Sequence, residues 1–299
     1  MIVVLAGGTG GAKLARGILD IAGADLAVIA NTADDLEIYG AYVSPDPDLV
    51  TFWLADRIDE RGWGLEGDTF QVMAQLRELG DDVWFNLGDR DLAIGLRRAR
   101  RLAEGATLTA CADELRRALG VPARVLPMSD DPVRTRIMSG GRWHGFQEFM
   151  IRERASGPID GVEFAGLEAA RATAAALEAI AAAEAIVVGP SNPVISIWPI
   201  LRTPGLEEAL RAARAPVVAV SPIVAGEVLK GVTGACLDWA GLSCDARGVA
   251  AAYGDLLDGV VADERVEDLP LHHTDLLMDG AEGRRRLARE TLEFAATLR

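Results

Sequence analysis

A short apolar run that leads into a glycine-rich turn constrains the fold of this chain most strongly. Ile2–Ala6 is continuously apolar, as is typical of a strand buried on both faces of a sheet. Residues 7–11 read Gly-Gly-Thr-Gly-Gly, and a helical pattern follows from Ala12 to Ile21. A second apolar run, Leu26–Ala30, completes a strand-helix-strand unit, whose crossover is expected to be right-handed.

The same alternation of apolar patterns continues along the chain. Further strands are predicted at Val83–Asn86, Arg124–Pro127, Ala185–Val188, Val217–Val220 and Val260–Val261. Helices are predicted at Leu49–Ile58, Phe70–Leu79, Leu92–Leu102, Leu108–Leu119, Leu167–Ala183, Pro204–Ala213, Ala246–Leu257 and Glu282–Leu298. We therefore expect an α/β, Rossmann-like fold, with a mostly parallel sheet and helices on both faces.

One segment interrupts the alternation. The segments Arg134–Met138 and Arg142–Phe149 flank Ser139-Gly140-Gly141, which predicts a β-hairpin. We expect a single domain over residues 1–299, with an inserted smaller excursion at about residues 130–165.

Composition limits the partners and the compartment. The formal net charge of −15 disfavours binding to nucleic acid or to an anionic membrane. Neither a signal peptide nor an apolar run of about 20 residues is visible, so we expect a cytoplasmic protein without membrane association. The three cysteines lack metal-ligand spacing, as expected for free thiols. His272-His273 is interpreted as a solvated turn and His144 as packing in the hairpin.

Polar loops follow four of the predicted strands, at residues 7–11, 31–35, 87–91 and 189–193. Ser221-Pro222 follows a fifth. Ligands of open parallel sheets bind outside the carboxyl ends of the strands, so these loops are expected to line one crevice. Scattered surface turns are the alternative.

The glycine turn itself is a predicted anion site. Backbone N–H groups of Gly8, Thr9 and Gly10 at a helix N-terminus favour phosphate, and Lys13 adds charge unless it is simply solvated. The P-loop lysine and the dinucleotide spacing G-x-G-x-x-G are both missing. A tight turn that only packs the helix is the competing interpretation.

The aspartates near the predicted crevice suggest a metal-binding site. Asp46 and Asp48, in a proline-rich loop, are the first choice as Mg²⁺ ligands, and Asp34 and Asp35 compete for this role. An acidic surface turn is the alternative.

Two further loops contribute polar groups. Arg90, between Asp89 and Asp91, suits bidentate contact with phosphate, although either aspartate also suits a helix N-cap. Pro190-Ser191-Asn192 suits contact with a base or a phosphate, and residues 226–231, with Lys230, form another candidate loop.

The motifs LAGGTGGAKLARG, NTADD, SPDPD, LGDRDLA, LPMSDDPVRT, FQEF, GPSNPVIS, PILRTPG and SPIV closely resemble those of the 2-phospho-L-lactate transferase family, CofD or FbiA, of coenzyme F420 biosynthesis. The resemblance implies that the deazaflavin Fo attacks a guanosine diphosphate ester of phospho-lactate or phosphoenolpyruvate. GMP then leaves, F420-0 or dehydro-F420-0 forms, and Mg²⁺ bridges the diphosphate.

By resemblance, Arg90 lies near Fo, and Ser191 and Asn192 lie near the guanosine diphosphate. Asp48 or Asp89 is the expected base. The full set of expected substrate-binding residues is Gly8, Thr9, Gly10, Lys13, Asn31, Asp34, Arg90, Ser129, Pro190, Ser191, Asn192 and Ser221.

Other readings stay open at this point. A homodimer is expected, with apolar surface supplied by Trp198, Trp239 and Trp143. A non-catalytic nucleotide-binding regulator of the same fold is the alternative function, and the paired acids at Asp46 and Asp48 argue against it.

Overall fold

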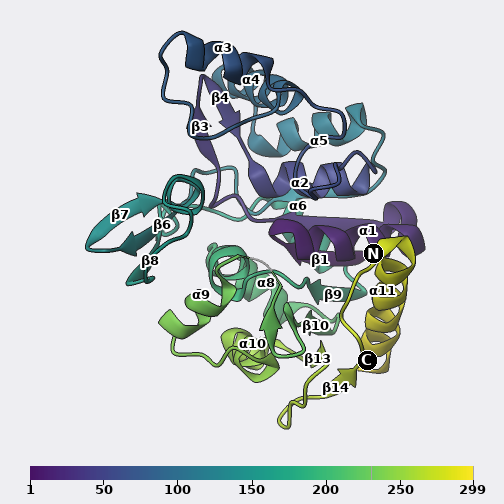
Figure 1. Cartoon of the computed structure of the whole chain (residues 1–299). Coiled ribbons are helices and arrows are strands. Elements are labelled where there is room, and N and C mark those ends of the chain that lie inside the picture. Colours follow the sequence, from purple (N-terminus) through teal and green to yellow (C-terminus); the bar gives the residue numbers. More distant parts are fainter. Residues whose placement is uncertain (230, 299) are drawn as a thin grey trace.

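The computed structural model describes residues 1–229 and 231–298, which place a seven-stranded parallel sheet at the centre (Figure 1). The strand order is β14-β13-β10-β9-β1-β2-β5, and every pair is parallel. The strands are β1 (Ile2–Ala6), β2 (Leu26–Ala30), β5 (Arg124–Pro127), β9 (Ala185–Val188), β10 (Val217–Val220), β13 (Gly259–Ala262) and β14 (Leu271–His273). The predicted fold class is confirmed.

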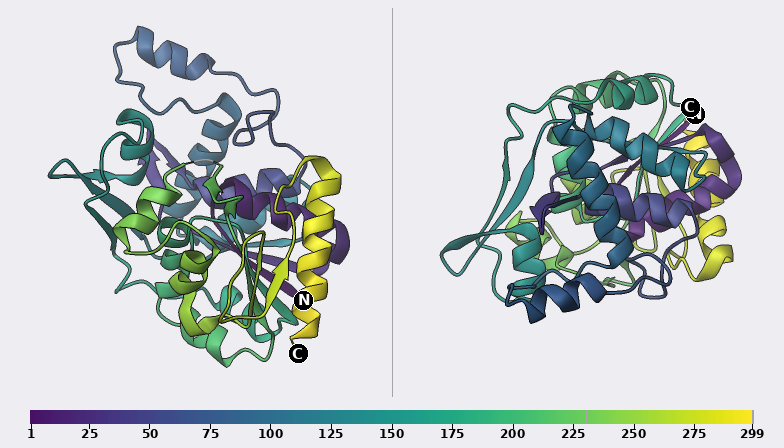
Figure 2. Two further views of the ribbon diagram at one scale, coloured as in Figure 1. Left: turned by 60° about the horizontal axis from the view of Figure 1, so that its bottom comes forward. Right: turned by 90° about the horizontal axis from the view of Figure 1, so that it is seen from above.

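Helices cover both faces of this sheet (Figure 2). Val4 and Ala6 of β1 pack toward α1 (Gly8–Ala22), α2 (Pro45–Leu54) and α11 (Gly280–Thr297). Val3 and Leu5 point to the opposite face, as alternation along a strand requires. That second face is covered by α6 (Ala174–Ala181), α7 (Trp198–Arg202), α8 (Leu206–Ala212) and α10 (Ala246–Tyr253).

A helical layer lies beyond the β2 and β5 side of the sheet, at the top of Figure 1. It contains the hairpin β3 (Leu36–Ile38) and β4 (Ala41–Val43) with α3 (Gln71–Glu78), α4 (Asp89–Ala103) and α5 (Leu108–Ala118). The predicted strand at Val83–Asn86 is wrong, because these residues form an irregular loop. The backbone N–H of Phe85 donates to the Tyr39 hydroxyl instead of to a neighbouring strand.

The interrupting segment forms a second, antiparallel sheet, which projects to the left in Figure 1. Its strands are β6 (Arg134–Ser139), β7 (Arg142–Gly145) and β8 (Gly161–Ala165). The predicted hairpin is confirmed, but its second strand ends at Gly145 rather than at Phe149. A π-helical turn, η2 (Glu148–Arg152), follows, and β8 was not predicted.

Several predicted boundaries need correction. Helix α2 begins at Pro45, a position that proline favours, so Asp46 and Asp48 lie in a first helical turn and not in a loop. Helix α6 is shorter than the predicted Leu167–Ala183, because the Thr173 side chain caps it at Ala174. His272-His273 is part of β14 rather than a turn, since β13 pairs with it.

The remaining short elements are η1 (Gly23–Asp25), η3 (Pro193–Ile197), β11 (Ile223–Val224), β12 (Glu227–Val228), α9 (Thr233–Trp239) and η4 (Gly254–Leu256). Lys230 of the candidate loop at 226–231 lies outside the described residues. In the described part of the chain, no helix is both long enough and apolar enough to cross a membrane.

Candidate active site

The glycine turn lies where the strand order reverses, with β1 flanked by β2 on one side and β9 on the other. Ligands of open α/β sheets bind at such a switch point. The Gly7 N–H donates to Ser191 Oγ at 3.1 Å, which joins the loops after β1 and β9. A Cβ at Gly10 would lie 2.0 Å from the Pro190 carbonyl oxygen, so only glycine permits this approach.

Asp46 connects the predicted loops at residues 7–11 and 31–35, and the Gly7–Ser191 bond adds the loop at 189–193. Its Oδ1 accepts from the Gly8 N–H at 2.7 Å, and its Oδ2 accepts from Asn31 Nδ2 at 3.0 Å. The same Asn31 amide donates to Asp34 Oδ2 at 3.2 Å. The Ala33 N–H in turn donates to Asn31 Oδ1 at 2.9 Å, which orients the amide. The predicted convergence of residues 7–11, 31–35 and 189–193 is therefore confirmed.

The acids at this junction are buried without enough positive charge. Burial raises the pKa of Asp46 to about 6. Burial and the neighbouring Asp46 carboxylate raise the pKa of Asp34 well above its usual range. Asp34 Oδ1 is buried and has no hydrogen-bond partner among the described residues. Burial also raises the pKa of Asp35 to about 7, although Ser44 Oγ donates to its Oδ1 at 2.8 Å. Such an arrangement favours a bound cation.

Asp48 has a different environment. Both of its carboxylate oxygens accept from the guanidinium of Arg98, whose side chain is 4% exposed. Burial raises the pKa of Asp48, and Arg98 opposes that shift. The sequence reasoning missed Arg98, because one arginine in a basic helix carries no positional signal. Asp48 is thus an ion-pair partner here, and its role as a metal ligand stays a prediction.

A cavity of about 510 Å³ opens beside Asp46 and Asp48. Two further acids, Asp68 and Asp91, contribute to its wall. Large apolar residues line much of the remainder: Leu49, Phe52, Trp63, Phe70, Trp84, Phe85, Leu87 and Ile151. The cavity combines carboxylates with aromatic surface, which suits a planar ligand that carries polar groups.

Asp91 lines the cavity wall, although the sequence pattern suggested only a helix N-cap for it. Burial, followed by the charges of Asp48 and Asp68, raises its pKa to about 7. Its Oδ1 is buried without a hydrogen-bond partner in the described part of the chain. A carboxylate poised near neutral pH is suited to proton transfer.

The motif at residues 87–91 reaches the cavity from the start of α4 rather than from a strand end. Asp89 is half-buried, and it accepts from Thr69 Oγ1 at 2.5 Å and from the N–H groups of Gln71 and Val72 at 3.1 and 3.0 Å. These bonds lower its pKa and cap α3. Arg90 Nη1 donates to the Glu66 carbonyl at 2.8 Å.

The other predicted residues have contacts within the protein that do not involve the large cavity. Ser129 Oγ donates to the Arg171 carbonyl at 2.7 Å. Asn192 Oδ1 accepts from Val194 N–H at 2.9 Å and caps η3. Ser221 Oγ accepts from the Ile223 N–H at 3.1 Å. Thr9 lies in the first turn of α1, and the Lys13 ammonium lies 5.6 Å from the centre of the Trp53 ring.

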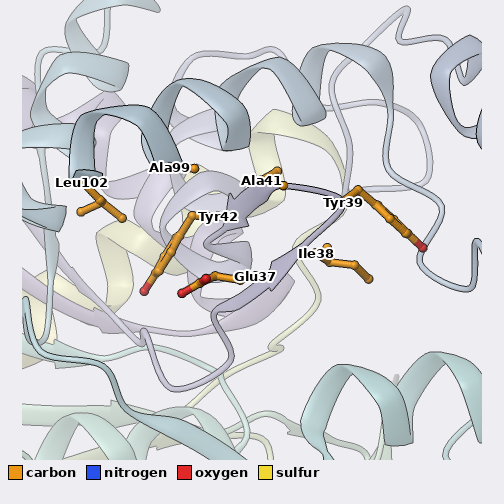
Figure 3. Close-up of a pocket in the computed structure, with 8 residues that line it drawn as sticks. Glu37, Ile38, Tyr39, Ala41, Tyr42, Ala99 and Leu102 are labelled. Atoms are coloured by element: carbon orange, nitrogen blue, oxygen red, sulfur yellow. The ribbon is translucent and has the colours of Figure 1, made fainter. Parts of the chain in front are cut away.

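A second cavity, of about 370 Å³, lies over the β3–β4 hairpin and shares no lining residue with the first (Figure 3). Tyr42, Glu37, Ala99 and Leu102 are among its lining residues. It contains none of the acids joined to the glycine turn, so the larger cavity is the candidate site.

Comparisons with known proteins show which family the chain belongs to. The model of the family 2-phospho-L-lactate transferase CofD matches residues 2–285. The chain is 39% identical to the 2-phospho-L-lactate transferase of Methanosarcina mazei over 298 residues, or 96% of this chain and 98% of that protein. It is 38% identical to the phosphoenolpyruvate transferase of Kitasatospora aureofaciens, covering 100% of this chain and 98% of that protein.

A crystal structure of a UPF0052 family member from Bacillus halodurans shares the fold. Its TM-score is 0.61 at 18% identity, over 97% of this chain and 98% of that one. The protein therefore belongs to the 2-phospho-L-lactate transferase CofD family and is an enzyme of that type, a phosphotransferase of coenzyme F420 biosynthesis.

Proposed function

We propose that this enzyme transfers a phospho-lactate or phosphoenolpyruvate unit from a guanosine diphosphate ester to Fo. The terminal ribityl hydroxyl oxygen of Fo attacks the phosphorus that carries the small acid. The bond from that phosphorus to the bridging oxygen breaks, and GMP leaves. Positioning and charge neutralisation supply most of the catalysis in such a transfer, so no protein nucleophile is needed.

The glycine turn is the proposed binding site for the diphosphate. The N–H groups of Gly7 and Gly8 already donate to Ser191 and Asp46. Those of Thr9 and Gly10 lie in the first turn of α1, where no carbonyl within the helix can accept from them. They are therefore the amides that we expect to face a phosphate.

Mg²⁺ fits the carboxylates beside this turn. Asp46 and the unpartnered Oδ1 of Asp34 offer hard oxygen ligands, and the raised pKa values of both reflect uncompensated negative charge. We retain Asp48 as a second ligand from the sequence prediction, although Arg98 now holds both of its oxygens. A bound Mg²⁺ would neutralise charge on the diphosphate and on the departing GMP.

The aromatic part of the large cavity is the proposed Fo site. Trp63, Phe70, Trp84 and Phe85 offer ring surface to a planar deazaflavin, and a volume of about 510 Å³ accommodates a ligand of that size. Asp91 lies in the same wall and is our preferred base for the ribityl hydroxyl. Asp89, the base suggested by sequence, has its pKa lowered by three hydrogen bonds and is a poorer proton acceptor.

The observation that carries this proposal is the placement of Asp46. It bonds to the glycine turn and also lines the aromatic cavity, so it joins a diphosphate site to an Fo site. Fo binding is tested by fluorescence titration of the metal-free protein, in which Trp84→Ala weakens binding about tenfold through lost stacking. Trp239→Ala, outside the cavity, is the matched control. Equal affinities of both variants and the wild type would remove Fo from this cavity.

A further inference from the structure

Three potential metal ligands meet outside the proposed transfer site. They are His144 on β7, Glu148 at the start of η2 and Glu153 just after it. Each offers one nitrogen or oxygen atom, and these atoms lie within 4.8 Å of one another.

The histidine is the independent sign that this cluster has a ligand. Its side chain is only 7% exposed, and its Nδ1 is buried without a hydrogen-bond partner in residues 1–229 and 231–298. That Nδ1 lies 3.9 Å from Glu153 Oε1, too far for a hydrogen bond. The imidazole packs against the Phe149 ring, with the ring centres 6.3 Å apart, so it cannot easily turn toward water. An unpaired buried polar atom is costly, and a metal ion would satisfy it.

The π-helical turn explains why the two glutamates share a face. The Glu153 N–H donates to the Glu148 carbonyl at 3.1 Å, which stacks these residues one turn apart although they are five positions apart. In an α-helix, residues five positions apart point about 140° away from each other, at about 100° per residue. Single π turns often occur at functional sites.

We propose that His144, Glu148 and Glu153 form a site for a divalent transition metal such as Zn²⁺. One imidazole and two carboxylates suit Zn²⁺, with water as the fourth ligand, whereas Mg²⁺ prefers oxygen ligands alone. Tetrahedral geometry requires ligand atoms about 3.3–3.5 Å apart. The 3.9 Å separation of His144 Nδ1 and Glu153 Oε1 must therefore close by about half an ångström, and a pair at the 4.8 Å limit by more than one ångström, through rotation of the glutamate side chains.

One cation already contacts this cluster. Arg142 Nη2 donates to Glu148 Oε1 at 3.0 Å, but its side chain is largely exposed and is free to move into solvent. The site goes beyond the proposed transfer reaction and takes no part in it. Its metal would fix the turn that presents Gln147 and Ile151 to the wall of the 510 Å³ cavity.

Zn²⁺ binding to the full-length, metal-free protein tests the proposal. The protein competes with a chromophoric chelator for Zn²⁺ in excess Mg²⁺, which occupies sites that contain only oxygen ligands. We expect one Zn²⁺ per chain, with affinity at least about tenfold lower in Glu153→Gln. Glu153 is partly exposed and the substitution is isosteric, so the fold is preserved. His144→Ala should lose the site as well, although it also opens the packing against Phe149.

The matched control is His272→Ala. Within the described residues, His272 also has a buried, unpartnered Nε2, which lies 3.6 Å from Glu290, but no third ligand joins that pair there. If His272→Ala binds Zn²⁺ with the same affinity as the wild-type protein, the proposal is supported. Undiminished affinity in Glu153→Gln and Glu148→Gln, loss of affinity in His272→Ala instead, or no bound Zn²⁺ in the wild type would each overturn it.

Discussion

Replacing Gly10 by alanine tests whether the glycine turn and the loop after β9 must touch for catalysis. The added Cβ would lie 2.0 Å from the Pro190 carbonyl oxygen, whereas ordinary contact begins at 3.4 Å. The two loops must therefore separate by about 1.4 Å, the difference between these distances. Overpacking of this kind costs about 1–3 kcal/mol, and the better helix propensity of alanine returns about 1 kcal/mol.

We expect the free energy of unfolding, measured in urea, to fall by up to about 2 kcal/mol. Displacement of reacting groups by about 1 Å reduces turnover about 100-fold, so kcat/KM for GMP release should fall by about that factor. Gly17→Ala is the control, because its Cβ would lie 2.3 Å from the Arg284 carbonyl oxygen, on the same helix but at the contact with α11. It should lose similar stability while kcat/KM stays within about threefold. Equal losses of activity in both variants would refute the reasoning, as would full activity in Gly10→Ala.

Substitutions of three acids, Asp48, Asp91 and Asp35, test their proposed roles. Asp48→Ala should lower the unfolding free energy by about 3–5 kcal/mol, because the buried Arg98 loses its paired carboxylate and keeps only the Tyr42 carbonyl as an acceptor. The double variant Asp48→Ala with Arg98→Met should regain most of the stability that Asp48→Ala loses, as measured by urea titration, but it should not regain turnover. Restored turnover in the double variant would exclude Asp48 from the metal site. For Asp91→Asn, the rise of kcat/KM with pH through about 7 should disappear, since the deprotonated carboxylate is the proposed base; an unchanged pH profile would exclude it. In metal-free protein, Asp35 has a folded pKa of about 7 against about 3.9 unfolded, so stability should fall by up to about 4 kcal/mol as pH rises from about 4 to about 7. Asp35→Asn should flatten that decline, and an unaltered slope would contradict the cause assigned.

The central sheet and the glycine turn were predictable from sequence because their signals are local. A short apolar run followed by glycines describes β1 and the start of α1 without reference to the rest of the chain. Val83–Asn86 has a similar apolar composition, but its aromatic side chains line a cavity and its backbone pairs with no strand. Composition alone cannot distinguish a strand of the central sheet from a loop that lines a cavity.

The candidate site was predictable only in part. The convergence of Asn31 and Ser191 follows from parallel topology, because they follow β2 and β9, the two neighbours of β1. Asp46, in the first turn of α2, bonds to Asn31 at the same edge of the sheet. The Arg98 pairing with Asp48 depends on how α4 packs against α2, which no sequence spacing specifies. Likewise, the cap formed by Asp89 and the cavity position of Asp91 depend on the loop at residues 66–71.

The most direct measurement of the central claim is turnover by purified protein. Fo, Mg²⁺ and either guanylylated phospho-acid are supplied, and GMP and the Fo phosphodiester are quantified together. The account predicts equal amounts of both products with at least one donor. It also predicts a dependence on Mg²⁺ and a loss of about 100-fold or more in Asp46→Asn, which keeps the size of the side chain but removes its charge and one of its two acceptor oxygens. Absence of the phosphodiester with every donor, or full activity in Asp46→Asn, would contradict it.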